Sequence, residues 1–562
     1  MSAETKSTTT DRVISPIAHT IVSTSNELRV DICLALMVAA ASVVLALFWS
    51  LYDHRFPTAD EAAHIINSIT AKGLLEHFRP WHYRWWYEVF TISSFYPPFA
   101  YVVNGAFLLV FGQSRFVEHV YMAFFGGLMV SSVYGLTRLL HGGRLAAVTS
   151  CLYLSAYPLI SWLGHTYFLD MPAVAMTALA LMTLLWWRTS SNPNLLRTTL
   201  CGLVLGAACL TKQMVVAYIV PVTLYFFIVD VTRAFRENNS VGIAAKRWLL
   251  HTIWFAAICI FVSSPFVLYS CQLYKGWLGT NVEDFAHAGI HHTFIGNLYY
   301  FLGILPSVMS PPLLVVFLMS FLFLRRPEYS KLATLIISTV GGLAFTCTCM
   351  GTDLEERYLV PFLIAPAIFS GFLTSALYCS AAVWRRTLGM VLILLAVWKY
   401  AVYNYSPYPI PLPEPPSFAR CREHNGNPNC ELDWGYSLVL ETIKRMDGDK
   451  IVYLNILSNH ETLHIHAFEL LLREQGNFAI LPTGSRKWTI VGDQVQFDPA
   501  TAWHFQWYLL KTGRTGFRFC DKQSEREYAK LVDYVRNSGS YKLIVQKPLP
   551  DGSELMLYRR TF

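Results

Sequence analysis

The sequence predicts a polytopic α-helical membrane protein with a small α/β domain at its C-terminal end. Of the 562 residues, 54% are hydrophobic and 14% are charged, whereas a soluble domain is about 45–50% apolar and about 25% charged. The apolar excess lies in long runs between residues 32 and 403, and residues 404–562 have the composition of a soluble domain. The sequence therefore predicts a membrane domain over 32–403 and a second domain over 404–562.

About eleven apolar runs have a length near that which a tilted helix needs to cross a bilayer. The first run is about twenty residues long, which exceeds the apolar region of a signal peptide, so we expect an uncleaved span after a tail of residues 1–31. The predicted spans are Ile32–Leu51, Phe116–Leu140, Leu145–Leu163, Leu169–Trp187, Leu195–Leu210, Met214–Val229, Leu249–Ser270, Leu305–Leu324, Leu332–Met350, Leu359–Leu377 and Thr387–Tyr403.

Positive residues in alternate loops predict which side of the membrane each loop faces. Cytoplasmic loops carry the excess of Lys and Arg. One set of loops, apart from the first loop and the tail, contains only Lys212, Lys275 and Arg357. The N-terminus is then cytoplasmic and residues 404–562 lie outside the cytoplasm. This topology explains the net charge of +7, which therefore indicates no nucleic-acid partner. The positive set consists of Arg138, Arg144, Arg188, Arg197, Arg233, Arg236, Lys246, Arg247, Arg325, Arg326, Lys331, Arg385 and Arg386.

The first outer loop, residues 54–115, contains one further apolar run, Tyr96–Gly112. If this run crossed the membrane, every later loop would change sides and the positive residues would face outward. The run also begins at Pro97-Pro98 and contains Asn104. We therefore predict an interfacial or re-entrant helix within the outer loop.

A second helix is predicted near the start of the same loop. Thr58 followed by Glu61 forms a capping box, and Asp60 and His64 then share one helix face with Asn67 by their spacing. Acidic residues at a helix start also favour the macrodipole, so Asp60 has a purely structural explanation as well. The aromatic run 81–87 is typical of interfacial anchors, with sugar or lipid contact as the alternative.

The order of several motifs resembles the GT-C superfamily of membrane glycosyltransferases, nearest to its protein O-mannosyltransferase and lipid A aminoarabinose transferase branch. The resemblance covers residues 32 to about 380, and all of its motifs fall on the outer side of the predicted topology. Tyr96 stands where His is common in the mannosyltransferases, and Phe99 where Leu is common. The motifs are Asp60-Glu61, Tyr96-Pro97-Pro98-Phe99, His165-Thr166-Tyr167-Phe168-Leu169-Asp170-Met171-Pro172, Leu210-Thr211-Lys212 preceded by Gly202 and Gly206, and Glu356-Arg357-Tyr358-Leu359-Val360-Pro361.

The resemblance implies a GT-C-like fold and the inverting transfer of a sugar from a polyprenyl-phosphate donor to a glycan, lipid or protein acceptor outside the cytoplasm. Such chemistry needs a carboxylate for the acceptor proton and cations for the phosphate. The expected site residues are, for catalysis, Asp60, Asp170 and Glu61; for the donor phosphate, Arg357, Lys212 and Tyr358; and for substrate contact, His64, His165, Tyr96 and Arg84.

Structural explanations stay open for some of these residues. Asp170 could be a helix-start carboxylate, and Arg357 could pair only with Glu355 or Glu356, which would leave the phosphate to other cations such as Arg79 or Arg84. A lysine near bilayer depth, such as Lys212, is costly unless it pairs or faces a wet cavity. His64 and His165 could bind a metal ion with Asp60, but the three lack the close spacing of metal ligands. No cofactor is expected to be required, and a divalent metal is the less favoured alternative.

The region after the membrane domain begins with a Pro-rich linker, Ser406–Pro416. Predicted helices then alternate with strands, which indicates an α/β domain, and no Gly-rich phosphate loop is present. Cys421 and Cys430 flank a turn-rich segment and are predicted to form a disulfide, with Cys520 as another possible partner. The predicted elements are helices 436–446, 461–474 and 524–537 and strands 451–456, 488–491, 542–546 and 554–558.

Two other functions fit parts of this sequence. A transporter or flippase of lipid-linked sugars would also carry intramembrane charges and broken helices, but the chain shows no paired halves and its acidic candidates lie on one side. A non-catalytic membrane scaffold is the second. We expect a bacterial inner membrane as the location, with the endoplasmic reticulum membrane as the alternative.

Overall fold

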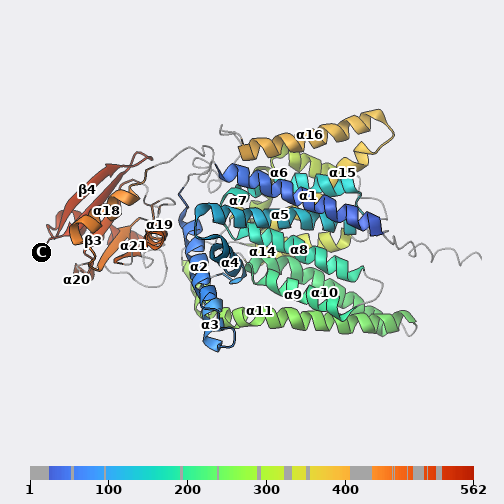
Figure 1. Ribbon diagram of the computed structural model, residues 1–562, viewed down its shortest axis with the longest axis horizontal. Coiled ribbons are helices and arrows are strands. Elements are labelled where there is room, and N and C mark those ends of the chain that lie inside the picture. The colour runs from blue at the N-terminus through green and yellow to red at the C-terminus, as the bar shows by residue number, and fades with distance from the viewer. Residues whose placement is uncertain are drawn as a thin grey trace, which may run out of the picture.

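The computed structural model consists of a bundle of long helices with a separate sheet domain at one end (Figure 1). The N-terminal end of the first helix lies at the opposite end of the bundle from the sheet domain. The structure describes residues 25–51, 56–93, 96–189, 194–236, 240–287, 293–321, 332–349, 355–405, 433–458, 460, 463–476, 479–484, 499–502, 504–513, 515 and 522–561.

The membrane domain confirms the predicted polytopic helical fold. Seven helices in the described part of the chain are long and apolar enough to span a membrane, or nine if each of two bent pairs counts as one span. The shorter apolar helices α9 and α14, which lie at two more of the predicted spans, run with the same bundle (Figure 1). The helices of the bundle are α1 (Ser25–Ser50), α5 (Arg115–Leu139), α6 (Arg144–Ala156), α7 (Pro158–His165), α8 (Asp170–Arg188), α9 (Leu195–Cys209), α10 (Gln213–Arg236), α11 (Ser240–His287), α12 (Phe294–Met309), α13 (Pro311–Ser320), α14 (Leu332–Cys349), the 3-10 helix η2 (Glu356–Leu363), α15 (Ile364–Tyr378) and α16 (Val383–Tyr405).

Two predicted spans are broken helices. The run Leu145–Leu163 is divided between α6 and α7, which meet at 70°, because Pro158 disfavours helical backbone at Tyr157. The predicted span Leu305–Leu324 is wrong in its course. Helix α12 already begins at Phe294 and turns by 111° into α13, at a Ser310 with a φ of 65° that stands before two prolines.

Three short helices of the first outer loop lie across the end of the bundle nearest the sheet domain (Figure 1). They are α2 (Ala59–Glu76), α3 (Tyr83–Phe90) and α4 (Phe99–Phe111). Helix α4 lies within the segment predicted to be an interfacial or re-entrant helix. Its 13 residues are too few to cross a bilayer. It packs closely on α2, since a Cβ on Gly105 would stand 2.8 Å from the Lys72 backbone nitrogen.

The C-terminal domain confirms the predicted α/β organisation. Its five-stranded sheet has the order β2-β1-β3-β5-β4, with β1 parallel to β2 and β3 and β5 antiparallel to β3 and β4. Strands β2 and β3, each 5 residues long, were not predicted from the sequence. The elements are α18 (Tyr436–Asp447), β1 (Val452–Leu457), α19 (Ile465–Glu474), β2 (Ile480–Gly484), α20 (Pro499–Ala502), β3 (Trp507–Lys511), α21 (Lys522–Asn537), β4 (Tyr541–Pro548) and β5 (Glu554–Arg560).

Three sequence predictions concern residues outside the described part of the chain. These are the linker Ser406–Pro416, the strand 488–491, and the disulfide between Cys421 and Cys430 with its alternative partner Cys520. The structure therefore does not test them.

Helix α19 joins the C-terminal domain to the outer helices of the membrane domain. It packs against α2, and Leu470 belongs to the hydrophobic core of the membrane domain. In the other direction, the ring of Phe56 in the first loop packs against the ring of Tyr436, with centroids 4.8 Å apart. Arg115 at the start of α5 lies 5.5 Å from the Phe56 ring and 4.0 Å from Glu474 of α19. The two domains therefore meet beside the first turn of α2.

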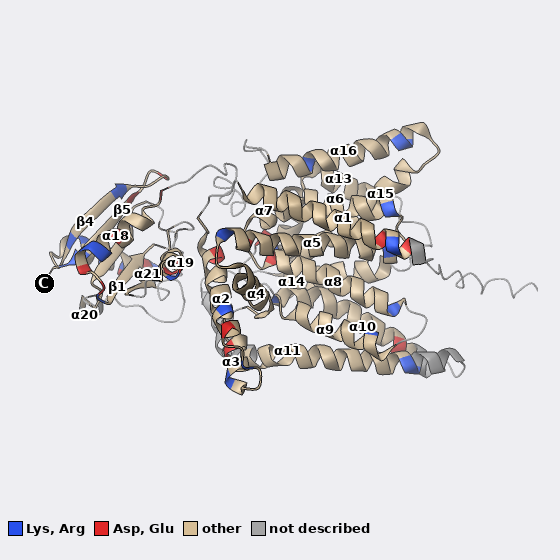
Figure 2. Ribbon diagram, viewed as in Figure 1, with Lys and Arg blue, Asp and Glu red and all other residues tan. Residues whose placement is uncertain are grey.

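Ion pairs hold the helices together at the opposite end of the bundle. Arg138 and Arg144 each donate to Asp31 of α1 at 2.8 Å, and Arg188 donates both of its terminal nitrogens to Asp230. Most charged residues of the membrane domain lie near the two ends of the bundle, and its middle is almost free of them (Figure 2). This distribution matches a bilayer that crosses the bundle between its charged ends.

Candidate active site

The first turn of α2 presents two neighbouring carboxylates in different surroundings. The predicted helix start is confirmed, with Thr58 as the residue before the helix. Glu61 is buried, and its two oxygens accept the backbone N–H groups of Thr58 at 2.9 Å and Tyr167 at 2.8 Å. Asp60, one residue earlier, keeps 55% of its side-chain surface exposed. The two carboxylates therefore have different roles: Asp60 is accessible, and Glu61 connects segments of the protein.

Asp60 is held by Arg357, which lies near the C-terminal end of the membrane domain in the sequence. The Arg357 guanidinium at the start of η2 donates to the Asp60 carboxylate at 3.1 Å and also pairs with Glu355. Desolvation of the part of Asp60 that faces the protein raises its pKa, but the charge and hydrogen bond of Arg357 more than offset this, so the pKa lies below its usual value. Asp60 is therefore ionised at neutral pH and available to accept a proton.

A second ion pair is almost completely enclosed. Lys212, in the turn between α9 and α10, donates to Asp170 at 2.6 Å, and the two side chains are 5% and 1% exposed. The turn holding Lys212 is fixed because the Phe99 amide at the start of α4 donates to the Leu210 carbonyl. A buried pair of this kind is expensive to break, since the remaining charge has no partner.

His64 is influenced by the charges of both ion pairs. It is buried, and its Nδ1 lies 2.9 Å from the Tyr101 hydroxyl. Burial lowers the pKa of His64 to about 4, with further electrostatic influence from Asp60, Arg357, Lys212 and Asp170. The imidazole is therefore neutral at pH 7 and cannot serve as a cation for a phosphate.

Aromatic rings surround the cations of the site. Tyr96 and Tyr358 face the Lys212 ammonium at 5.8 and 5.4 Å from their centroids. The Arg357 guanidinium lies 5.0 Å from the Phe168 ring. Burial raises the pKa of Tyr96, so its phenol remains protonated and is a hydrogen-bond donor. Cation–π contacts in a desolvated setting contribute about 2 kcal/mol each.

The structure thus brings together seven of the ten residues expected from the sequence at one end of the bundle. These are Asp60, His64, Tyr96, Asp170, Lys212, Arg357 and Tyr358.

Three other expected residues have different surroundings. His165 stacks on Trp49 of α1, with centroids 3.7 Å apart, so it packs α7 against α1. Arg84 lies on exposed α3, where it pairs with Glu88. Glu61 is buried, and each of its oxygens accepts one backbone N–H, from Thr58 and from Tyr167. The structure therefore gives His165, Arg84 and Glu61 other contacts than the seven residues above, and their expected roles in substrate contact and catalysis stay predictions.

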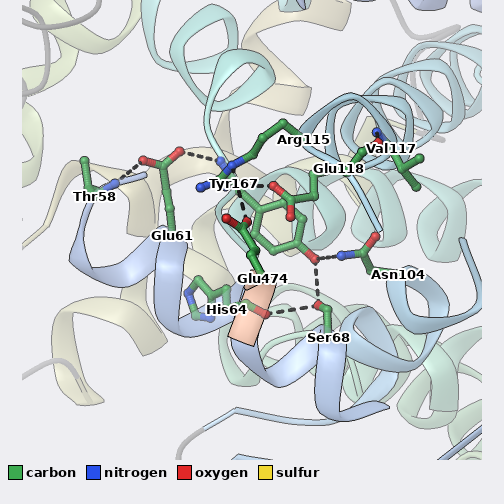
Figure 3. Close-up of polar contacts among 11 residues, drawn as sticks. Thr58, Glu61, His64, Ser68, Asn104, Arg115, Val117, Glu118, Tyr167 and Glu474 are labelled. Atoms are coloured by element: carbon green, nitrogen blue, oxygen red, sulfur yellow. Dashed lines mark hydrogen bonds and ion pairs between the residues drawn. The ribbon is translucent and has the colours of Figure 1, made fainter. Parts of the chain in front are cut away.

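Several residues near the site were not among the expected site residues. Glu355 was expected only as an ion-pair partner of Arg357, and Tyr167 and Phe168 were named only as members of the motif that ends at Pro172. Ser68 and Asn104 bind the Tyr167 hydroxyl (Figure 3). For Ser68, the spacing of seven residues from Glu61 could have indicated a shared helix face.

The described residues contain no group of three or more His, Cys, Asp or Glu side chains that could hold a metal ion. That a metal is not required stays a prediction.

Comparison with known proteins defines the class. The fold is that of the GT-C membrane glycosyltransferases. The structure is similar to that of ArnT from Cupriavidus metallidurans bound to undecaprenyl phosphate (TM-score 0.54, 13% identity) and to that of the same protein in the apo state (TM-score 0.53, 14% identity). Each match covers 95% of this chain and 98% of the ArnT chain. It also resembles the archaeal oligosaccharyltransferase AglB from Archaeoglobus fulgidus in complex with an inhibitory peptide and a dolichol-phosphate (0.51, 10%), over 95% of this chain and 74% of that one. At such identities the likeness shows the fold.

A family model narrows the assignment. Residues 75–276 match the family described as dolichyl-phosphate-mannose-protein mannosyltransferase. A search of curated proteins finds no match. The chain has the fold of the multi-pass GT-C membrane glycosyltransferases, and its family match is to a glycosyltransferase family.

Proposed function

We propose that this glycosyltransferase moves a sugar from a polyprenyl-phosphate-linked donor to an acceptor outside the cytoplasm, with inversion at the anomeric carbon. The observation that carries the proposal is the Asp60–Arg357 pair, an ionised and accessible carboxylate held beside a cation. The family match and the undecaprenyl phosphate and dolichol-phosphate bound by the similar structures support a lipid-phosphate donor.

The acceptor side of the reaction uses Asp60. An acceptor hydroxyl attacks the anomeric carbon from the face opposite the phosphate, and its proton passes to the Asp60 carboxylate. A carbon–oxygen bond to the acceptor forms as the bond between the anomeric carbon and the phosphate oxygen breaks. The polyprenyl phosphate leaves with the bonding electrons, so its negative charge increases during the step.

The donor side uses the two cations. Arg357 and Lys212 stabilise the charge that develops on the leaving phosphate. Arg357 does so by bidentate hydrogen bonding, and Lys212 does so as a point charge. These cations pair with Asp60, Glu355 and Asp170. A donor phosphate competes for them, which loosens Asp60 from Arg357 and prepares it to take a proton.

The location follows from the loop charges. With the arginine-rich loops in the cytoplasm, the site and the C-terminal domain lie on the outer side, and we propose a bacterial inner membrane, with the endoplasmic reticulum membrane as the alternative. The acceptor is a hydroxyl-bearing glycan, lipid or protein on that side.

The test is transfer of label by the purified full-length protein. Wild-type protein in detergent, given a polyprenyl-phosphate sugar with a radiolabelled hexose and membranes from cells lacking the enzyme, is expected to move label into those membranes. The Asp60→Asn variant is expected to lose about 10²–10⁴-fold in rate while it melts at nearly the wild-type temperature. Equal transfer by the Asn variant would remove Asp60 from the mechanism.

A second arm separates transfer from transport. In sealed vesicles, a flippase would move the labelled donor lipid across the bilayer without changing its chemistry. Intact donor on the opposite side, with no label in the acceptor fraction, would replace the proposed function by transport.

A further inference from the structure

Tyr167 lies in the short connection between α7 and α8, three residues before Asp170. Its side chain is buried, and its ring stacks on Tyr121 of α5 with centroids 5.5 Å apart. Neither its ring nor its hydroxyl takes part in the proposed chemistry. Its contacts nevertheless connect α2, which carries Asp60, to the start of α8, which carries Asp170.

Hydrogen bonds hold Tyr167 to α2 at two points, two helical turns apart. Its backbone N–H donates to Glu61 at 2.8 Å, and its hydroxyl lies 2.9 Å from the hydroxyl of Ser68. Positions seven apart share one face of a helix and are separated by about 10 Å along its axis. Tyr167 therefore lies along α2 rather than touching it at a single point (Figure 3).

The directions of these hydrogen bonds are fixed by their partners. Asn104 of α4 donates its amide N–H to the Tyr167 hydroxyl at 2.5 Å, and Ser68 donates to the His64 carbonyl at 3.0 Å. The Tyr167 hydroxyl must then donate to Ser68. A directed chain runs from Asn104 through Tyr167 and Ser68 to the backbone of α2 (Figure 3), and removal of the phenol oxygen interrupts it in the middle.

The residues that follow Tyr167 reach each cation in turn. The Phe168 ring lies 5.0 Å from the Arg357 guanidinium, and Asp170 accepts from Lys212. On the other side of the connection, Glu61 directly follows Asp60 in α2. A shift of Tyr167 along α2 would therefore change the spacing between the Asp60–Arg357 pair and the Asp170–Lys212 pair.

We infer that Tyr167 is a positioning residue, which sets the separation of the two ion pairs through its hydrogen bonds to Glu61, Ser68 and Asn104. It contacts α2, α4 and α5 together. The inference rests on the proposed function, because the spacing matters only where donor phosphate and acceptor must be aligned. Misplacement of reacting groups by about 1 Å costs about 10²-fold in rate.

The variant that tests this is Tyr167→Phe, with Tyr153→Phe as the matched control. Tyr153 is equally buried, and its hydroxyl bonds Thr374 at 2.9 Å and the Leu392 carbonyl at 3.3 Å, away from the ion pairs. Both variants lose one buried phenol oxygen. We expect similar losses in melting temperature, but a fall in kcat of about 10- to 100-fold only for Tyr167→Phe, with donor KM within about threefold of wild type.

A milder variant keeps the test decisive if Tyr167→Phe is poorly folded. Ser68→Ala removes one bond of the chain and is expected to lower kcat by about fivefold. Because both substitutions interrupt the same chain, the double variant should lose no more than Tyr167→Phe alone. Multiplied effects in the double variant, or equal kcat in Tyr167→Phe and Tyr153→Phe, would overturn the inference.

A second readout does not need turnover and separates this inference from the proposed function. Amide hydrogen exchange should become at least tenfold faster in peptides covering 58–68 and 164–171 in Tyr167→Phe, and stay unchanged there in Tyr153→Phe. Faster exchange without any transfer by the wild type would contradict the proposed function alone. Unchanged exchange in Tyr167→Phe would contradict the positioning role alone.

Discussion

Arg357 donates a hydrogen bond of 3.1 Å to Asp60, across a sequence separation of 297 residues. The contact connects the first helix of the outer loop to the 3-10 helix η2 near the end of the membrane domain. It also keeps the Asp60 carboxylate ionised against the effect of burial. The ionisation of the proposed base therefore depends on a residue that lies 297 positions later in the sequence.

Replacement of Arg357 should change both donor binding and the pH profile. In Arg357→Ala, the pKa of Asp60 should rise, because burial remains and the opposing cation is gone. The acidic limb of the activity profile, where Asp60 takes up a proton, should therefore move to higher pH, and donor KM should increase at least tenfold. The measurement is initial rate against donor concentration at several pH values.

Arg357→Lys is the conservative control for this prediction. It keeps the charge but not the planar pair of donors, so the acidic limb should move less than in Arg357→Ala, and donor KM should still rise. An Arg357→Ala enzyme with the wild-type limb and KM would place both the base and the phosphate elsewhere.

Lys212→Ala should destabilise the protein as well as inactivate it. The substitution leaves the Asp170 carboxylate, which is 1% exposed, without its partner, and breaking a buried ion pair in this way costs about 3–5 kcal/mol. The double variant Lys212→Met with Asp170→Asn removes both charges and should recover most of the melting temperature. It should remain inactive, because the donor phosphate still lacks its cation.

Arg188→Met is the comparison, since it breaks the buried pair with Asp230 at the other end of the bundle. It should lose stability without a change in donor KM. If the neutral Lys212 and Asp170 pair transfers sugar at the wild-type rate, the second ion pair is structural only.

Sequence patterns were sufficient for the elements of the site but not for its assembly. The capping box predicted the start of α2, because a helix cap depends on neighbouring residues. The loop charges along the chain predicted a helix within the outer loop at the run that contains α4. The site residues that were identified lie on such elements, at the first turn of α2, the start of α8 and the start of η2.

Assembly of the site depends on contacts that no local pattern encodes. Glu61 was assigned to catalysis from its position beside Asp60, but both of its oxygens bind backbone amides. His165 belongs to a motif of the family, but it stacks on Trp49 of α1. Sequence spacing places a residue at the end of a helix, and only the packing of that helix against its neighbours decides which group the side chain meets.

Acid should destabilise the protein partly through His64. Its pKa is lowered from 6.5 to about 4 in the folded state, so between these values the unfolded chain takes up a proton that the folded protein does not. The stabilisation is fully present above pH 6.5 and is lost as the pH falls toward 4, at up to about 1.4 kcal/mol per pH unit. Melting temperatures measured across this range should show the decrease.

His64→Asn provides the comparison, because its side-chain oxygen can replace Nδ1 as the acceptor for Tyr101 without titrating. The melting temperature of the wild type should fall more steeply from pH 6.5 to 4 than that of the variant. His464, whose pKa burial lowers to about 3, is present in both proteins and its effect cancels. Parallel curves would mean that His64 does not contribute to acid sensitivity.

The predicted disulfide can be checked directly in the outer domain. If residues 404–562 lie outside the cytoplasm, Cys421 and Cys430 are in a compartment where disulfides persist, and the short closed loop should stabilise the domain by about 2–3 kcal/mol. Peptide mapping without reduction, on protein taken from its native membrane, should recover the two cysteines in one linked peptide. Free thiols at both positions, or linkage to Cys520, would contradict the predicted pairing.

The side of the membrane on which the site lies follows from whether α4 crosses the bilayer. Asn104 is unsuitable for labelling because it is buried and donates to Tyr167, whereas Gln113 beyond α4 and Gly143 between α5 and α6 are exposed. In a background without the exposed Cys33 and Cys379, single cysteines at these two positions should react with a membrane-impermeant maleimide from opposite sides. Only α5 separates the two positions, so this result tests that α5 spans.

A third cysteine at Lys72 of α2 should then react from the same side as Gln113, because α4 is 13 residues long and lies across the bundle end. Reaction of Lys72 and Gln113 from different sides would make α4 a span and would separate Asp60 from the side assigned to Asp170.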